Sequence, residues 1–168
     1  LTDGAPVAGM ILAVMAVASV AALSVTPRLL ESQLFRPYWI TRRGNWSTWI
    51  TSAFIHADYP HLLLNALTFW SFGFSLERAI GSVRFMALYA LALVVSEIGT
   101  FLKHRDNPDY ASLGASGAVL AVLFASIIYF PTQSLYILPI PFPIPAPLFA
   151  IAYLAYTIYA SRRNVGRI

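Results

Sequence analysis

The stretch Leu113-Gly114-Ala115-Ser116-Gly117-Ala118-Val119-Leu120 opens a run of about eighteen uncharged residues that ends at Phe130. This length is close to the ~20 apolar residues that cross a bilayer as a helix. Glycine lets neighbouring backbone come close, so Gly114 and Gly117 leave the hydroxyl of Ser116 uncrowded. The stretch therefore predicts a membrane helix with an accessible serine near its N-terminal end.

The composition of the whole chain agrees with a membrane location. Of 168 residues, 58% are hydrophobic and only 11% are charged, whereas a soluble domain has about a quarter charged; the mean hydropathy is +0.68. The net charge of +4 lies in the loops, where basic residues set orientation or contact lipid headgroups rather than nucleic acid. The absence of cysteine excludes thiol catalysis, disulfides and thiolate metal sites. We expect no cofactor and no metal.

Hydropathy predicts an all-α membrane protein, a polytopic helical bundle in one domain over residues 1–168. The predicted spans are residues 7–25, 59–76, 85–102, 113–130 and 147–161. Residues 26–58 are too polar to cross, and their tryptophans and arginines predict a loop in the headgroup layer. Alternating prolines from Pro139 predict extended or polyproline-like chain, with the last helix starting near Pro147. We see no signal peptide, and expect both ends of the chain to be trimmed.

Three polar side chains are predicted to meet under one membrane surface. Because successive spans cross the membrane in opposite directions, the helices of Ser116 and His61 begin on the same side. Each residue lies near the start of its helix. Asn65 follows His61 by four residues and shares its helix face, one turn deeper. Each pattern alone is typical of helix packing. Together they favour a polar functional cavity inside the membrane.

These residues carry a resemblance to a known family. Gly114-Ala115-Ser116-Gly117 matches the GxSG motif of rhomboid intramembrane serine proteases, and His56-Ala57-Asp58-Tyr59-Pro60-His61-Leu62-Leu63-Leu64-Asn65 resembles that family's HxxxxHxxxN signature. Phe74-Ser75-Leu76-Glu77-Arg78 resembles its following acidic-basic turn, and residues 26–58 are similar to its first loop. GxSG alone is a weak signal, but both motifs in this order of spans are specific.

The resemblance implies a rhomboid-like core with five of six helices present, and it implies a role for each motif residue. Ser116 is the expected nucleophile, while His61 and Asn65 hold the developing oxyanion with the Ser116 amide. His56 is expected to steady the first loop and Glu77 to tie helices together. Gly114 and Gly117 are supporting residues of the motif.

One part of the family pattern is missing from this sequence. Rhomboids take their catalytic histidine from the start of a sixth helix, whereas this sequence ends at Ile168. Besides His56 and His61 there is only His104, which we expect to be solvated in a loop. A stripe of small residues four apart, which begins at Gly117, also has no obvious partner among the five predicted helices, although we expect another helix to lie against it. We therefore expect the base and its helix beyond Ile168.

The resulting hypothesis is a serine endopeptidase that cleaves transmembrane segments of other membrane proteins. The first alternative is a catalytically inactive rhomboid-like protein that binds or chaperones membrane helices. The second is a small channel or transporter, which Glu97 inside a predicted span would suit. A plainer role for Glu97 is that of a protonated or hydrogen-bonded carboxyl between helices.

Location and orientation rest on different signals. We expect a multi-pass protein of a prokaryotic cell membrane, with an organelle inner membrane as the alternative. Nine basic residues lie on the Ser116 side: Arg28, Arg36, Arg42, Arg43, Lys103, Arg105, Arg162, Arg163 and Arg167; Arg78 and Arg84 lie on the other. The positive-inside rule would make the Ser116 side cytoplasmic. The resemblance implies the opposite, and we follow the resemblance.

Overall fold

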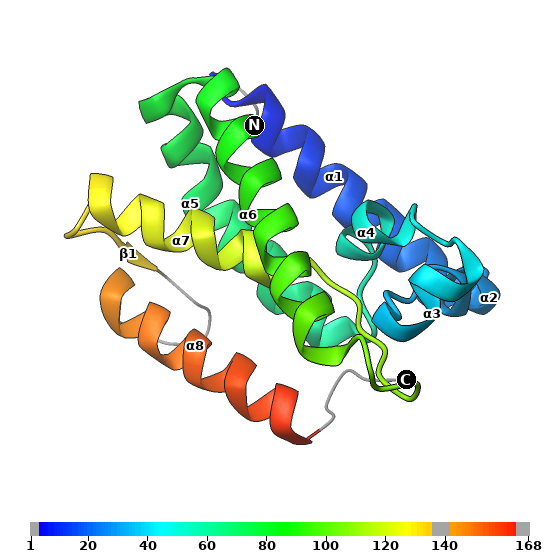
Figure 1. The fold of residues 1–168 in the computed structure, drawn as a ribbon. Helices are drawn as coiled ribbons and strands as arrows, with labels where there is room; N and C mark the ends of the chain where they lie inside the picture. Colours follow the sequence, from blue (N-terminus) through cyan, green and yellow to red (C-terminus); the bar gives the residue numbers. More distant parts are fainter. Residues whose placement is uncertain (1–3, 136–141, 164–168) are drawn as a thin grey trace.

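The computed structural model describes residues 4–135 and 142–163, and these form a bundle of helices (Figure 1). The long helices are α1 (Pro6–Val20, continued by the π-helix η1, Ala21–Val25), α5 (Tyr59–Ile80), α6 (Ser82–His104), α7 (Ser116–Tyr129) and α8 (Ala146–Arg163). The short ones are α2 (Pro27–Ser32), α3 (Pro37–Arg43), α4 (Thr48–Thr51) and the 3-10 helix η2 (Ser52–Phe54). The strands β1 (Ser134–Leu135) and β2 (Ile144–Pro145) pair antiparallel before α8.

Helix α7 is the centre of the bundle, because it contacts α5, α6 and α8. Its inner face consists of Val119, Val122 and Leu123, none of which is exposed. Aromatic rings fill the space beside them: Phe69 of α5 packs edge-on against Phe85 of α6, with ring centroids 6.0 Å apart. This packing joins α5, α6 and α7 into one hydrophobic core.

The outer face of the bundle is apolar. Val83 and Leu91 of α6 are 85% and 65% exposed, and Ile128 of α7 is 80% exposed. Burial of such side chains stabilises a protein by about 25 cal/mol per Å² in water, so an exposed apolar belt indicates a lipid surrounding. By length and composition, Pro6–Val25 and Ser82–His104 are able to cross a membrane, and α7 and residues 146–159 are shorter apolar helices.

Helices α2, α3 and α4 gather at the end of α1 away from the N-terminus (Figure 1). The loop of residues 26–58 therefore does not cross the bundle as a helix, and it is folded rather than extended. A backbone bridge between Phe35 and Ser112 and a 3.1 Å hydrogen bond from Trp39 Nε1 to the Pro108 carbonyl fasten it to the loop before α7.

Several predicted boundaries differ in the structure. Helix α7 begins at Ser116 and not at residue 113, because Gly114 has φ +114°, a value outside helical geometry. Helices α5 and α6 are longer than predicted and meet at Gly81, whose φ of 81° makes the turn in one residue. Helix α8 begins at Ala146 instead of Pro147, directly after β2. Part of the predicted proline segment, residues 139–141, lies outside the described residues.

Candidate active site

The loop before α7 brings the backbone of the Ser116 motif against two histidines. Gly114 donates its N–H to the Ser52 carbonyl over 3.0 Å, which joins the motif to η2. A Cβ atom on Gly114 would lie 2.8 Å from His61 Cε1 and 3.4 Å from His56 Cδ2. Only glycine accommodates both the positive φ and this close approach.

Ser116 and His61 are in contact, although 55 residues separate them in the chain. Ser116 Oγ lies 3.4 Å from His61 Nε2, at the long end of hydrogen-bond distance. The Asp58 carboxylate caps α5 by accepting the His61 N–H at 2.7 Å, so the first turn holds His61 in place. The two helix starts thus meet at one end of the bundle, the arrangement that the span count predicted.

Asn65 lies one turn deeper in α5 and is fully buried. Its Nδ2 donates to the His61 carbonyl at 2.9 Å, and its Oδ1 accepts the Tyr153 hydroxyl at 2.9 Å. A carboxamide has two N–H donors; only one of them is engaged by the described residues. Tyr153 lies on α8, 88 residues further along, and nothing local in the sequence indicated that it orients Asn65.

His56 is held by Ser19 of α1. The Ser19 hydroxyl donates to the Phe54 carbonyl at 3.1 Å, so toward His56 it can only accept. It accepts from the His56 backbone N–H at 3.2 Å and from Nδ1, 3.0 Å away. His56 is therefore the Nδ1–H tautomer, and its Nε2 is buried without a hydrogen-bond partner among the described residues.

The environment of His56 opposes its protonation. Burial, with the His61 ring adding to the effect, lowers the pKa of His56 from 6.5 to about 3. The two imidazole rings meet edge to face, with centroids 5.0 Å apart. A neutral His56 next to the motif matches a positioning role better than proton transfer.

His104 was predicted to be solvated in a loop, and this prediction was wrong. It is the last residue of α6, half-buried, and its ring stacks on Tyr110 with centroids 3.6 Å apart. The charged return loop folds back over the end of α6, which brings the tyrosine onto the imidazole.

Glu77 joins three helices at the opposite end of the bundle. Its buried carboxylate accepts the backbone N–H groups of Val7 at 3.1 Å and Ala8 at 2.6 Å, in the first turn of α1. It also accepts the Ser82 hydroxyl at 2.7 Å, at the start of α6. A negative charge at a helix N-terminus satisfies free N–H groups and interacts favourably with the helix dipole.

The small-residue stripe of α7 does have a partner among the described helices, contrary to the prediction. A Cβ atom on Gly117 would overlap the Ser96 side chain of α6, 2.5 Å from its Cβ. Beside this contact is a cavity of about 10 Å³, lined by Glu97 and by Gly114, Ala115 and Gly117 among others. Glu97 Oε2 is buried there without a hydrogen-bond partner in the described residues.

These features define a class: a helical membrane protein in which a serine at a helix start contacts a histidine from a neighbouring helix. The Rhomboid domain matches residues 43–167, more than half of the chain. The chain belongs to the rhomboid family, whose members share a polytopic helical membrane fold and include serine intramembrane proteases.

Several curated proteins are similar to this chain. It is 37% identical to the putative rhomboid protease YdcA of Bacillus subtilis (strain 168) over 79 residues, 47% of this chain and 39% of that protein. It is 36% identical to rhomboid protease GluP of the same organism over 83 residues, 49% of this chain and 16% of that protein. It is 31% identical to RHOMBOID-like protein 12, mitochondrial, of Arabidopsis thaliana over 125 residues, 66% of this chain and 37% of that protein. The chain spans at most 39% of the length of these three relatives.

Proposed function

We propose that this protein is an intramembrane serine protease that cleaves transmembrane segments of other membrane proteins, with Ser116 as the nucleophile. The observation that supports this most directly is the contact of Ser116 Oγ with His61 Nε2, 3.4 Å apart at the start of α7. The relatives named as proteases and the membrane fold of the family add support.

In the proposed reaction, Ser116 Oγ bonds to the carbonyl carbon of the substrate and gives its proton to a base. The carbonyl oxygen becomes negative, and three donors stabilise it: His61 Nε2–H, Asn65 Nδ2–H and the Ser116 backbone N–H. The first N–H groups of a helix have no partner inside the helix, so that of Ser116 is available. Donors aimed at a forming oxyanion lower such barriers by about 2.7–4 kcal/mol each.

When the peptide C–N bond breaks, the base returns its proton to the leaving amine, and water then hydrolyses the serine ester. A serine of ordinary pKa needs a base, and we expect that base to be a histidine beyond Ile168. Because a transmembrane helix hides its carbonyls in hydrogen bonds, the substrate must unwind locally before attack. Helix-weakening residues near the cleaved bond should therefore favour cleavage.

The test replaces Ser116 by alanine in the complete protein, with Ser112→Ala, four residues earlier in the same loop, as a matched control. We expect Ser116→Ala to abolish cleavage of a transmembrane substrate in detergent and to abolish labelling by a fluorophosphonate, while the melting temperature is kept. Ser112→Ala should keep both activities.

Retained cleavage by the Ser116→Ala protein would reject Ser116 as the nucleophile. If the unmodified complete protein neither cleaves nor is labelled, the alternative of a non-catalytic protein that binds membrane helices is favoured instead.

A further inference from the structure

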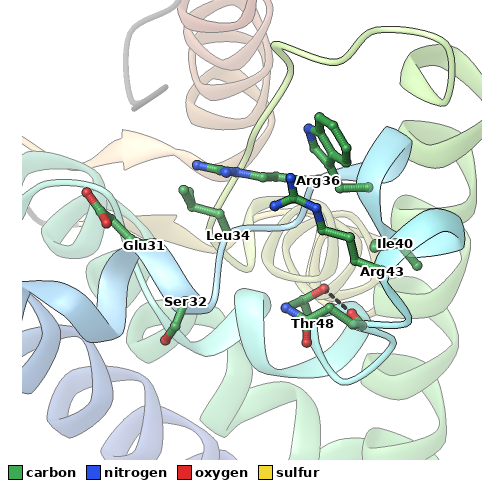
Figure 2. Close-up of a pocket in the computed structure, with 9 residues that line it drawn as sticks. Glu31, Ser32, Leu34, Arg36, Ile40, Arg43 and Thr48 are labelled. Carbon is green, nitrogen blue, oxygen red and sulfur yellow. Dashed lines mark hydrogen bonds between the residues drawn. The ribbon is translucent and has the colours of Figure 1, made fainter.

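A pocket lies in the loop of residues 26–58, apart from the Ser116 site (Figure 2). It has a volume of about 170 Å³ and is bounded by residues of α2, α3 and the segment that leads into α4. Buried Leu34 and Ile40 form its apolar part, and Arg36, Arg43 and Asn45 give it polar donors.

The two arginines line the same pocket and form no ion pair with an acidic side chain of the described residues. Figure 2 shows the Arg36 side chain extending toward the side of the pocket where Glu31 lies, and the Arg43 side chain ending near Arg36. Two guanidinium groups that line one pocket repel each other unless an anion lies between them. The pocket is therefore suited to an anion.

The surroundings hold one of these arginines in place and add a neutral donor. The Arg43 guanidinium carbon lies 4.0 Å from the centroid of the Trp39 ring, a cation–π contact that leaves the N–H groups free at its edge. Trp39 is itself fixed by its hydrogen bond to the Pro108 carbonyl. Asn45 Oδ1 accepts from the Ser47 hydroxyl at 3.2 Å, so its amide nitrogen is left to donate elsewhere.

This donor set suits a phosphate group. Guanidinium groups bind phosphate with paired, parallel hydrogen bonds, which makes arginine the usual residue for this anion. A pocket of about 170 Å³ with two such groups offers room for one headgroup phosphate.

The position of the pocket indicates where the phosphate comes from. Trp46 and Ile50, on the adjoining turn into α4, are 55% and 60% exposed, which is typical of side chains at a membrane surface. Phospholipid phosphates lie in that layer, and basic residues there bind anionic lipids. We propose that Arg36 and Arg43, supported by Trp39 and Asn45, form a binding site for the phosphate of an anionic phospholipid headgroup.

The same contacts connect this site to the Ser116 loop. The Trp39 indole N–H donates a hydrogen bond to the Pro108 carbonyl. The backbone of Phe35 pairs with that of Ser112, four residues before Ser116. A bound headgroup would therefore stabilise the loop of residues 26–58 against the loop that positions the serine. The binding site itself does not depend on the proposed protease activity.

The test titrates the complete protein in maltoside micelles with dioctanoyl phosphatidylglycerol and follows the melting temperature, which rises when a ligand binds the folded state. Dioctanoylglycerol, which lacks the phosphate, is the neutral comparison. The double variant R36Q/R43Q is compared with R28Q/R42Q, which removes the same charge from the same loop outside the pocket. Because R36Q/R43Q loses the charge-assisted hydrogen bonds of both guanidinium groups, it should weaken the apparent affinity at least about tenfold. The control pair should stay close to the unmodified protein.

Four results would contradict the phospholipid site. Equal affinity in both double variants, or an equal effect of dioctanoylglycerol, would overturn it. Stabilisation by inorganic phosphate alone, with none from the lipid, would show a free-anion site and overturn the lipid assignment. If R36Q/R43Q does not fold, R36K/R43K keeps the charge and loses the paired geometry; we expect intermediate affinity, and unchanged affinity would contradict the proposal.

Discussion

At the scale of single residues, hydrogen bonds fix the tautomer or the orientation of the polar side chains in the site. Ser19 donates to the Phe54 carbonyl, and this hydrogen-bond pattern assigns the Nδ1–H tautomer to His56. The Tyr153 hydroxyl donates to Asn65 Oδ1, which fixes the amide nitrogen of Asn65 toward the His61 carbonyl. In the proposed reaction, donors held in this way require no reorganisation when charge develops.

His56 makes the stability of the protein depend on pH in a definite direction. Its pKa is 6.5 when exposed and about 3 in the folded protein, so between these values the unfolded state binds more protons. Stability should therefore fall as the pH drops below about 6.5, by up to about 1.4 kcal/mol per pH unit. The measurement is thermal unfolding of the unmodified protein and of His56→Asn between pH 4 and 8. Parallel curves for the two proteins would contradict a neutral, buried His56.

At the scale of elements, the carboxylate of Glu77 holds the start of α1 to the turn between α5 and α6. It lies within hydrogen-bond distance of three donors and is 0% exposed. A buried charge that loses its partners, or partners that lose their charge, destabilise a fold far more than the loss of a surface pair does.

Replacing Glu77 by glutamine keeps the volume but removes the charge and one acceptor oxygen. We expect the free energy of unfolding to fall by about 1.5–3 kcal/mol, because charge-assisted bonds to the α1 amides are lost. The melting temperature in detergent measures this, with Glu31→Gln on the exposed end of α2 as the control. If both substitutions lower the melting temperature equally, Glu77 does not cap α1 as described.

At the scale of the whole molecule, an apolar outer belt surrounds a polar site. A soluble enzyme instead exposes many charged side chains on its outer surface. Leu91 and Leu102 are both exposed on α6, 65% and 59%, but Leu91 lies near the middle of the helix and Leu102 in its last turn. If lipid surrounds the belt, only the central position should exclude a charge.

Leu91→Arg should reduce the yield of folded protein in membranes sharply, since an arginine at the centre of a span is unfavourable by about 2.5–3.5 kcal/mol. Leu102→Arg should be tolerated, because an arginine near a helix end reaches the interface. The measurement is the amount of folded protein extracted from membranes, determined by size-exclusion chromatography. Equal yields would mean that lipid does not contact α6 at Leu91.

Sequence patterns predicted the family and the helical membrane fold, and both are confirmed. Long apolar runs and local motifs are enough for these, since helix length and residue spacing are local properties. The assigned roles of Ser116, His61 and Asn65 stay predictions, although the structure brings the first two into contact.

What the sequence missed depends on contacts between distant segments. The hydrogen bond from Tyr153 to Asn65 and the contact of Gly117 with Ser96 depend on how the helices pack. The periodicity of the sequence therefore does not indicate them. The start of α7 was placed three residues early because hydropathy continues through Gly114, whereas the backbone turns there.

The two attachments of α1 have a consequence for the order in which the protein assembles. Its start is held by Glu77 and its far part, through Ser19, by the His56 segment. Both partners are synthesised after α1. The uncharged residues 7–25 allow the helix to enter the bilayer before these two partners are in place. Its docking becomes complete only once the ribosome has passed Glu77.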